Sequence, residues 1–182
     1  MNLKNPVQKS VLTGVMAALL AVLSQIALPM PSGVPVTLQT FAVALCGYIL
    51  GPGLGALSVA VYLALGAVGL PVLSGFSGGI GAFLGVTGGF LWGFLPMAFL
   101  CGLGMKIGKK YLAIPLGIAG LLVCHLCGAA QFAALMATTF WQAFLVASAP
   151  YFIKDIISVA LAFLAAVAVS NGLKKAGIGG SV

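Results

Sequence analysis

The chain has 182 residues, of which 62% are hydrophobic and 5% charged, and its formal net charge is +7. A mean hydropathy of +1.25 excludes a soluble globular domain, because such a domain needs polar side chains to cover its surface. The composition predicts an all-α integral membrane protein, since helices satisfy their own backbone hydrogen bonds in lipid.

The first predicted span covers about Ser10 to Leu28, and Pro29, Pro31 and Pro35 then force an extended connection. We expect no cleaved signal peptide, because the apolar stretch shows no small-residue cleavage pattern and runs on into further spans. Small residues recur on this helix at helical spacing and form a flat face for close packing, either within the bundle or against a partner: Gly14, Ala17, Ala18, Ala21 and Ser24.

Two shorter apolar runs follow, about Leu38 to Leu50 and about Leu54 to Val68. Each is short for a full crossing, so the pair forms either two compact spans or a re-entrant hairpin. The glycine-rich stretch from Gly69 to Gly89 is too apolar for a solvated loop. Irregular backbone at membrane depth is tolerated where it is buried in protein or lines a cavity, so this stretch is a candidate binding element.

Three more spans complete a compact bundle of six transmembrane helices, a single domain over residues 1–182: about Phe90 to Met105, Tyr111 to Ala137 and Pro150 to Ser170. Positive charge is retained on the cytoplasmic side of a membrane, so we expect both termini to be cytoplasmic. This orientation also places seven lysines inside: Lys4, Lys9, Lys106, Lys109, Lys110, Lys174 and Lys175. The basic charge therefore predicts contact with the anionic headgroups of a lipid bilayer, and no nucleic acid partner.

Asp155, the only acidic residue, is expected about one turn inside the outer end of the last span. An ionisable side chain there costs several kcal/mol unless it is paired with an opposite charge or takes part in binding or transport. Asp155 is therefore a candidate binding residue. The alternative is a structural pair with Lys154. We rank that alternative second, because adjacent helix residues point about 100° apart and pair poorly.

His125, the single histidine, lies between two cysteines in the fifth span. A zinc site needs about four ligands, and the sequence offers no second cluster with ligand spacing, so we expect no metal and no cofactor. We expect His125 to hydrogen-bond to a neighbouring helix. The cysteines fall inside apolar segments and are interpreted as packing residues: Cys46, Cys101, Cys124 and Cys127.

The sequence gives no sign of nucleotide binding or of an enzyme. Gly108-Lys109 is similar to the end of a phosphate loop, but Leu103 stands where the first glycine belongs and Lys110 replaces the required Ser or Thr. One carboxylate and one histidine provide no paired acids, and no serine lies in a recognisable nucleophile turn. Any energy input for transport must therefore come from partner proteins.

Three segments together resemble the BioY family, the biotin-binding substrate-capture subunits (S components) of energy-coupling-factor (ECF) transporters. They are Val34 to Thr40, Gly69 to Phe94, and Pro150 to Asp155. Two residues depart from the family pattern: Val86 stands where the family usually has Pro, and Ser158 where it usually has a lysine. Lys154, one helical turn before Ser158, is the candidate replacement for that cation.

The resemblance implies a pocket open to the outer side, covered by the connections after the first and third helices. It also implies that the small-residue face of the first helix docks on a transmembrane coupling subunit, which two ATPase subunits drive. Biotin offers ureido N–H donors, which suit Asp155, and a carboxylate, which suits Lys154. The remaining expected contacts are neutral hydrogen-bonding or aromatic residues: Thr37, Gln39, Ser77, Thr87, Phe41, Phe83 and Tyr151.

Two other functions remain open at this stage. The chain could be an S component for a different vitamin, or a membrane assembly factor with no ligand. Whether biotin stays with the detergent-purified protein separates these alternatives.

Overall fold

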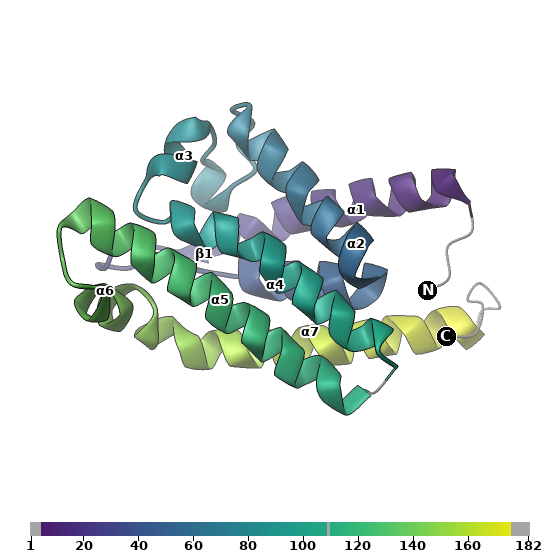
Figure 1. The fold of residues 1–182 in the computed structure, drawn as a ribbon. Coiled ribbons are helices and arrows are strands. Elements are labelled where there is room, and N and C mark those ends of the chain that lie inside the picture. Colours follow the sequence, from purple (N-terminus) through teal and green to yellow (C-terminus); the bar gives the residue numbers. More distant parts are fainter. Residues whose placement is uncertain (1–4, 109, 176–182) are drawn as a thin grey trace.

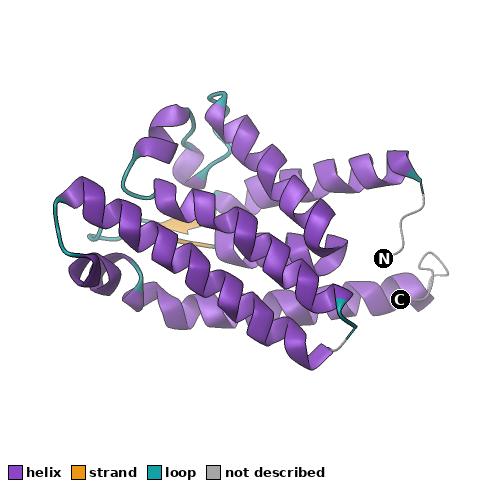
Figure 2. Cartoon of the chain, viewed as in Figure 1, coloured by secondary structure: helices purple, strands orange, loops and turns teal. Residues whose placement is uncertain are grey.

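The computed structural model describes residues 5–108 and 110–175, and it consists almost entirely of helices (Figures 1 and 2). Five helices are long and apolar enough to cross a membrane: α1 (Pro6–Ser24), α2 (Gln39–Ala67), α4 (Gly88–Lys106), α5 (Lys110–Met136) and α7 (Ala149–Lys175). The predicted all-α membrane fold is thus confirmed. Shorter elements connect these helices: β1 (Ala27–Leu28), β2 (Val36–Thr37), the 3₁₀ turn η1 (Ser74–Phe76), α3 (Ile80–Leu84) and α6 (Phe140–Ala147).

Helix α2 is broken at Gly51, where the positive φ of +81° turns the chain back on itself just before Pro52. A Cβ added to Gly55 would lie 2.7 Å from the Cα of Gly47, whereas residues eight apart in a straight helix are separated by about 12 Å. The two halves of α2 therefore form a helical hairpin. Its turn lies beside Gly102, about one helical turn from the lysine end of α4, in keeping with two compact spans.

The described lysines gather at one end of the bundle, apart from Lys154. Lys9 lies in the first turn of α1, Lys106 ends α4 and Lys175 ends α7. Figure 1 places the α1 start, the α4–α5 connection and the α7 end together, with β1, α3 and α6 at the opposite end. Lys4 and Lys109 lie outside the described residues. The separation of charge agrees with the predicted orientation, which stays a prediction with respect to the membrane.

Helix α6 was not predicted from the sequence, which assigned no element between the last two spans. Its start is a capping box: the Gln142 backbone N–H donates to the Thr139 hydroxyl at 3.4 Å, and the Thr139 N–H donates to the Gln142 side chain at 3.2 Å. This Thr-x-x-Gln signal is legible in the sequence. The helix buries Ala143 and Ala147 at the end of the bundle that carries the site described below.

Helices α4 and α5 pack at backbone distance because glycines line α4 where the two meet. A Cβ added to Gly89 would lie 2.2 Å from the Cys127 carbonyl oxygen, and one added to Gly93 would lie 2.6 Å from the Cα of Cys124. Small residues permit such approach where no hydrophobic effect drives membrane helices together. Cys46, Cys101 and Cys124 are buried and Cys127 is half-buried, in keeping with their interpretation as packing residues.

Replacing Gly93 with alanine should destabilise the bundle by about 1–3 kcal/mol, because the new methyl group meets the α5 backbone and neither helix can yield without repacking. Thermal unfolding in detergent measures the effect. Gly172→Ala is the matched control, since its added Cβ meets nothing within 4 Å. Equal unfolding temperatures for the two variants would contradict backbone-distance packing of α4 on α5.

The orientation can be tested with a membrane-impermeant maleimide applied to intact cells. On a Cys127→Ala background, Ser77→Cys at the α3 end should be labelled from outside, because Ser77 is exposed there. Lys106→Cys, exposed at the lysine end, should be labelled only after the cells are opened. Labelling of Lys106→Cys in intact cells would reverse the assigned topology.

Candidate ligand-binding site

A cavity of about 270 Å³ opens at the end of the bundle opposite the lysines. This volume is close to the lower end of the range for small-molecule sites, about 300 Å³. Helices supply most of its wall: Gln39, Thr40, Phe90, Leu91, Phe94, Leu121, Cys124, His125, Ala147, Tyr151, Lys154 and Asp155. Apolar and aromatic side chains share this wall with convergent polar groups, a combination typical of a site for a small organic molecule.

Two irregular connections cover this cavity. The segment between α1 and α2 contributes Gly33, Val34, Pro35 and Thr37, and the glycine-rich stretch contributes Leu73, Ser74, Ser77, Ala82 and Thr87. The prediction that the glycine-rich stretch lines a cavity is therefore confirmed. So is the expectation that the pocket is covered by these two connections.

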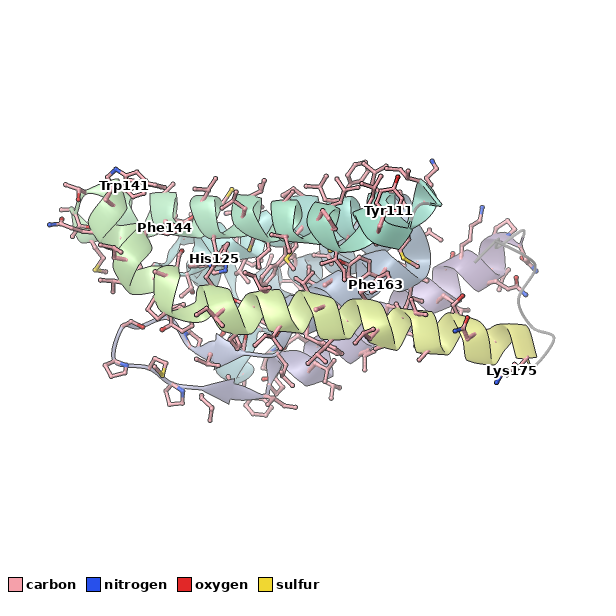
Figure 3. All side chains as sticks on the ribbon, turned by 90° about the horizontal axis from the view of Figure 1, so that it is seen from below. Tyr111, His125, Trp141, Phe144, Phe163 and Lys175 are labelled. Carbon is pink, nitrogen blue, oxygen red and sulfur yellow. The ribbon has the colours of Figure 1, made fainter. Side chains whose placement is uncertain are left out.

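The charged centre of the site is Asp155, whose residue is only 5% exposed. One carboxylate oxygen, Oδ2, lies 3.3 Å from Nε2 of His125 on α5, which confirms the predicted contact of His125 with a neighbouring helix. The other, Oδ1, contacts the Lys154 ammonium. Figure 3 shows His125 between α5 and α7, pointing into the bundle.

The expectation that Lys154 and Asp155 pair poorly is wrong. Their side chains leave the helix about 100° apart. The flexible four-carbon stem of lysine nevertheless lets the ammonium bend back to the neighbouring carboxylate. The same ammonium donates to the Thr37 carbonyl at 3.0 Å. Because both side chains also line the cavity, the ion pair is part of the candidate site rather than an alternative to it.

Helix α7 holds the first connection over the cavity at two points. The Tyr151 hydroxyl donates to the Val34 carbonyl at 2.6 Å and contacts the Ser32 hydroxyl, while Lys154 binds the Thr37 carbonyl. β1 and β2 pair antiparallel beside these contacts, with Ala27 opposite Thr37. The connection is therefore fixed by side chains that also form the cavity wall.

Polar side chains on apolar helices hold the glycine-rich stretch. The Gln25 amide donates to the Val72 carbonyl at 2.9 Å and accepts from the Phe76 N–H at 2.9 Å. Gln131 donates to the carbonyls of Phe83 at 2.8 Å and Gly85 at 2.7 Å. Sequence reasoning missed both glutamines. The available signal was a primary amide within an apolar span, which needs a partner in a membrane.

Seven of the nine residues expected to bind a ligand line the cavity: Thr37, Gln39, Ser77, Thr87, Tyr151, Lys154 and Asp155. Phe41 and Phe83 do not. Phe41 follows Thr40 by about 100° around α2 and so faces away, and Phe83 packs against Trp92 with ring centroids 5.3 Å apart. The aromatic wall comes instead from Phe90 and Phe94, one turn apart on the same face of α4.

Most of the expected contacts have partners within the chain, including Ser77, whose hydroxyl donates to the Ser74 carbonyl at 2.8 Å. Gln39 donates to the Tyr62 hydroxyl at 2.7 Å and accepts from the Thr37 hydroxyl at 3.3 Å. The Thr37 and Gln39 side chains thus stabilise the start of α2 beside the cavity. Thr87 precedes α4 and makes no capping bond to it with its side chain.

The small-residue face of α1 is divided. Ala17 and Ser24 are buried in the bundle, Ala21 is half-buried, and Gly14 and Ala18 are exposed. The Ser24 hydroxyl donates to the Val72 carbonyl at 2.6 Å, so this residue holds the glycine-rich stretch in place. Only Gly14, Ala18 and part of Ala21 remain accessible to a partner.

Comparison with known proteins gives one consistent result. The model of the BioY family matches residues 1–175. The "Probable biotin transporter BioY" of Pyrococcus horikoshii is 44% identical over 134 residues, covering 73% of this chain and 78% of that protein. The "Biotin transporter BioY" of Rhodobacter capsulatus is 44% identical over 131 residues, covering 71% of this chain and 67% of its own length.

A solved structure shares the fold over nearly the whole chain. It is described as the S-component for biotin from an ECF-type ABC transporter, and it superposes with a TM-score of 0.76 at 28% sequence identity. The match covers 90% of this chain and 93% of that structure. The arrangement of helices around the cavity is therefore one already observed in a substrate-binding membrane subunit.

Proposed function

The chain belongs to the BioY family, and from this membership we propose that it is the biotin-binding S component of an ECF-type importer. It is a multi-pass protein of the cytoplasmic membrane, and BioY proteins are transporter subunits rather than enzymes. The observation that carries the proposal is the covered cavity, whose wall contains the only acidic side chain of the chain.

Asp155 is the group best suited to bind the ureido ring of biotin. An ionised carboxylate offers about four acceptor sites, and His125 and Lys154 occupy one on each oxygen, which leaves about two for the ureido N–H groups. Hydrogen bonds to a charged acceptor are about twice as strong as neutral ones. Phe90 and Phe94 offer an apolar wall for the fused ring.

The carboxylate of biotin is assigned to the Thr87 hydroxyl, which makes no capping bond to α4, rather than to Lys154 alone. Ser77 can join it only by turning its hydroxyl away from the Ser74 carbonyl, to which it donates at 2.8 Å. The Lys154 ammonium has three donors, of which Asp155 and the Thr37 carbonyl occupy two. A ligand whose ureido ring reaches Asp155 extends its valerate tail away from Lys154. Ser77, exposed at the mouth, lies on the segment that such a tail would pass.

Transport requires partners that supply energy, since the sequence contains no intact phosphate loop. The related structure is an S component of an ECF-type ABC transporter, which supports a complex with a transmembrane coupling subunit and ATPase subunits. The exposed small residues Gly14 and Ala18 on α1 are the proposed docking face for the coupling subunit.

Asp155→Asn should weaken biotin binding about tenfold or more, on the order of 1.5–3 kcal/mol, because a charged acceptor is replaced by an amide whose N–H groups face those of the ligand. Equilibrium binding of labelled biotin to the purified proteins measures this. Ser170→Asn, at the far end of the same helix, is the control and should bind as the wild type does. Unchanged affinity in a well-folded Asp155→Asn protein would remove Asp155 from the ligand contacts.

Gly14→Trp and Ala18→Trp should abolish uptake by cells while leaving biotin binding to the isolated subunit unchanged, because a bulky ring blocks close helix docking. Leu19→Trp is the matched control, exposed on α1 about 100–140° around the helix from these residues. Ala17→Trp would not test docking, since Ala17 is 2% exposed and its replacement disturbs the bundle. Simultaneous loss of binding and uptake in Ala18→Trp would argue against a docking face.

A further inference from the structure

We infer that His125 is a positioning residue for biotin recognition: it fixes the Asp155 carboxylate in the orientation that receives the ligand. The inference rests on the proposed function, because it concerns how the same site binds its ligand. His125 is 2% exposed, lines the cavity, and places Nε2 3.3 Å from Asp155 Oδ2. This contact joins α5 to α7 across the charged centre of the site.

The chemistry of the pair sets the direction of the hydrogen bond. An ionised carboxylate can only accept, so Nε2 of His125 carries the proton and donates it to Asp155. Lys154 holds the other carboxylate oxygen. With a donor on each oxygen, the carboxylate cannot rotate freely about its terminal bond, and its remaining acceptor sites keep one direction.

Lys154 alone would not provide this restraint. Its side chain is 31% exposed, against 3% for His125, and it reaches Asp155 through a flexible stem that can follow the carboxylate as it turns. The imidazole has no such freedom. Its ring packs edge-on against Phe90 at 5.8 Å and Phe152 at 5.2 Å, and the Ser148 hydroxyl donates to the His125 carbonyl at 3.3 Å.

His125 therefore acts through a fixed ring and a fixed backbone, which is what preorganisation of a buried acceptor requires. A ligand that meets an already oriented carboxylate does not have to order it on binding. The predicted consequence is a loss of affinity when the donor is removed, and recovery when a different side chain returns a donor to the same place.

The first experiment compares His125→Gln with His125→Met by equilibrium binding of labelled biotin to the full chain in detergent. The glutamine amide nitrogen is as many bonds from the backbone as Nε2 and can donate, whereas methionine has similar length and no donor. We expect His125→Met to weaken binding at least tenfold and His125→Gln to stay within about threefold of the wild type. Equal losses in both variants, or none in either, would overturn the inference.

A double variant separates positioning from an independent contact. If His125 acts through Asp155, His125→Met combined with Asp155→Asn should bind within about threefold of Asp155→Asn alone. Losses that multiply would show that His125 acts independently of Asp155 and would overturn the inference. Failure of the wild type itself to bind biotin would instead overturn the proposed function.

A spectroscopic test does not depend on the His125 variants folding. The chain has one histidine, so selective ¹⁵N-histidine labelling, with any affinity tag removed, reports a single imidazole. We expect a proton on Nε2, whose resonance shifts in Asp155→Asn because the charged acceptor is lost. The same spectrum in both proteins would show that no hydrogen bond to Asp155 orients the ring.

Discussion

The structure depends on keeping one carboxylate ionised inside an apolar bundle. Removing such a group from water costs several kcal/mol, and the chain has no second acid with which to share a proton. The cost is offset by donors from different parts of the chain: His125 from α5 and Lys154 from α7, while Lys154 also binds the Thr37 carbonyl of the first connection. Satisfying Asp155 thus brings two helices and the cover of the cavity together.

The residues at the α4–α5 contact and at the α5–α7 contact differ in size, and this difference leaves room for the cavity. Glycines let α4 approach the backbone of α5, whereas the α5–α7 contact contains the rings of His125 and Phe152. The irregular connections then close the open end, and their backbone groups need partners in the absence of bulk water. Gln25, Gln131 and Tyr151 provide those partners, so the covers are held by hydrogen bonds rather than by apolar packing alone.

Hydropathy and lysine placement were sufficient to predict the helical membrane fold, because lipid constrains length and charge along the chain directly. The site was only partly predictable. Asp155 was found from the cost of its charge, but the Lys154 contact depends on a side-chain conformation. The direction of Phe41, away from the cavity and against the core, depends on where α2 begins. The hairpin at Gly51 was left open because glycine and proline permit a break without specifying its angle.

Helix α1 connects the proposed docking face to one of the two covers of the cavity. Its exposed side presents Gly14 and Ala18, while its C-terminal end holds the glycine-rich stretch through Ser24 and the following Gln25. Those two residues make three hydrogen bonds to Val72 and Phe76, each contributing about 0.5–1.5 kcal/mol. A rigid displacement of α1 must therefore either carry this cover of the cavity with it or break bonds that together stabilise it by a few kcal/mol. Access to the cavity and the position of α1 are consequently linked by the same few polar atoms.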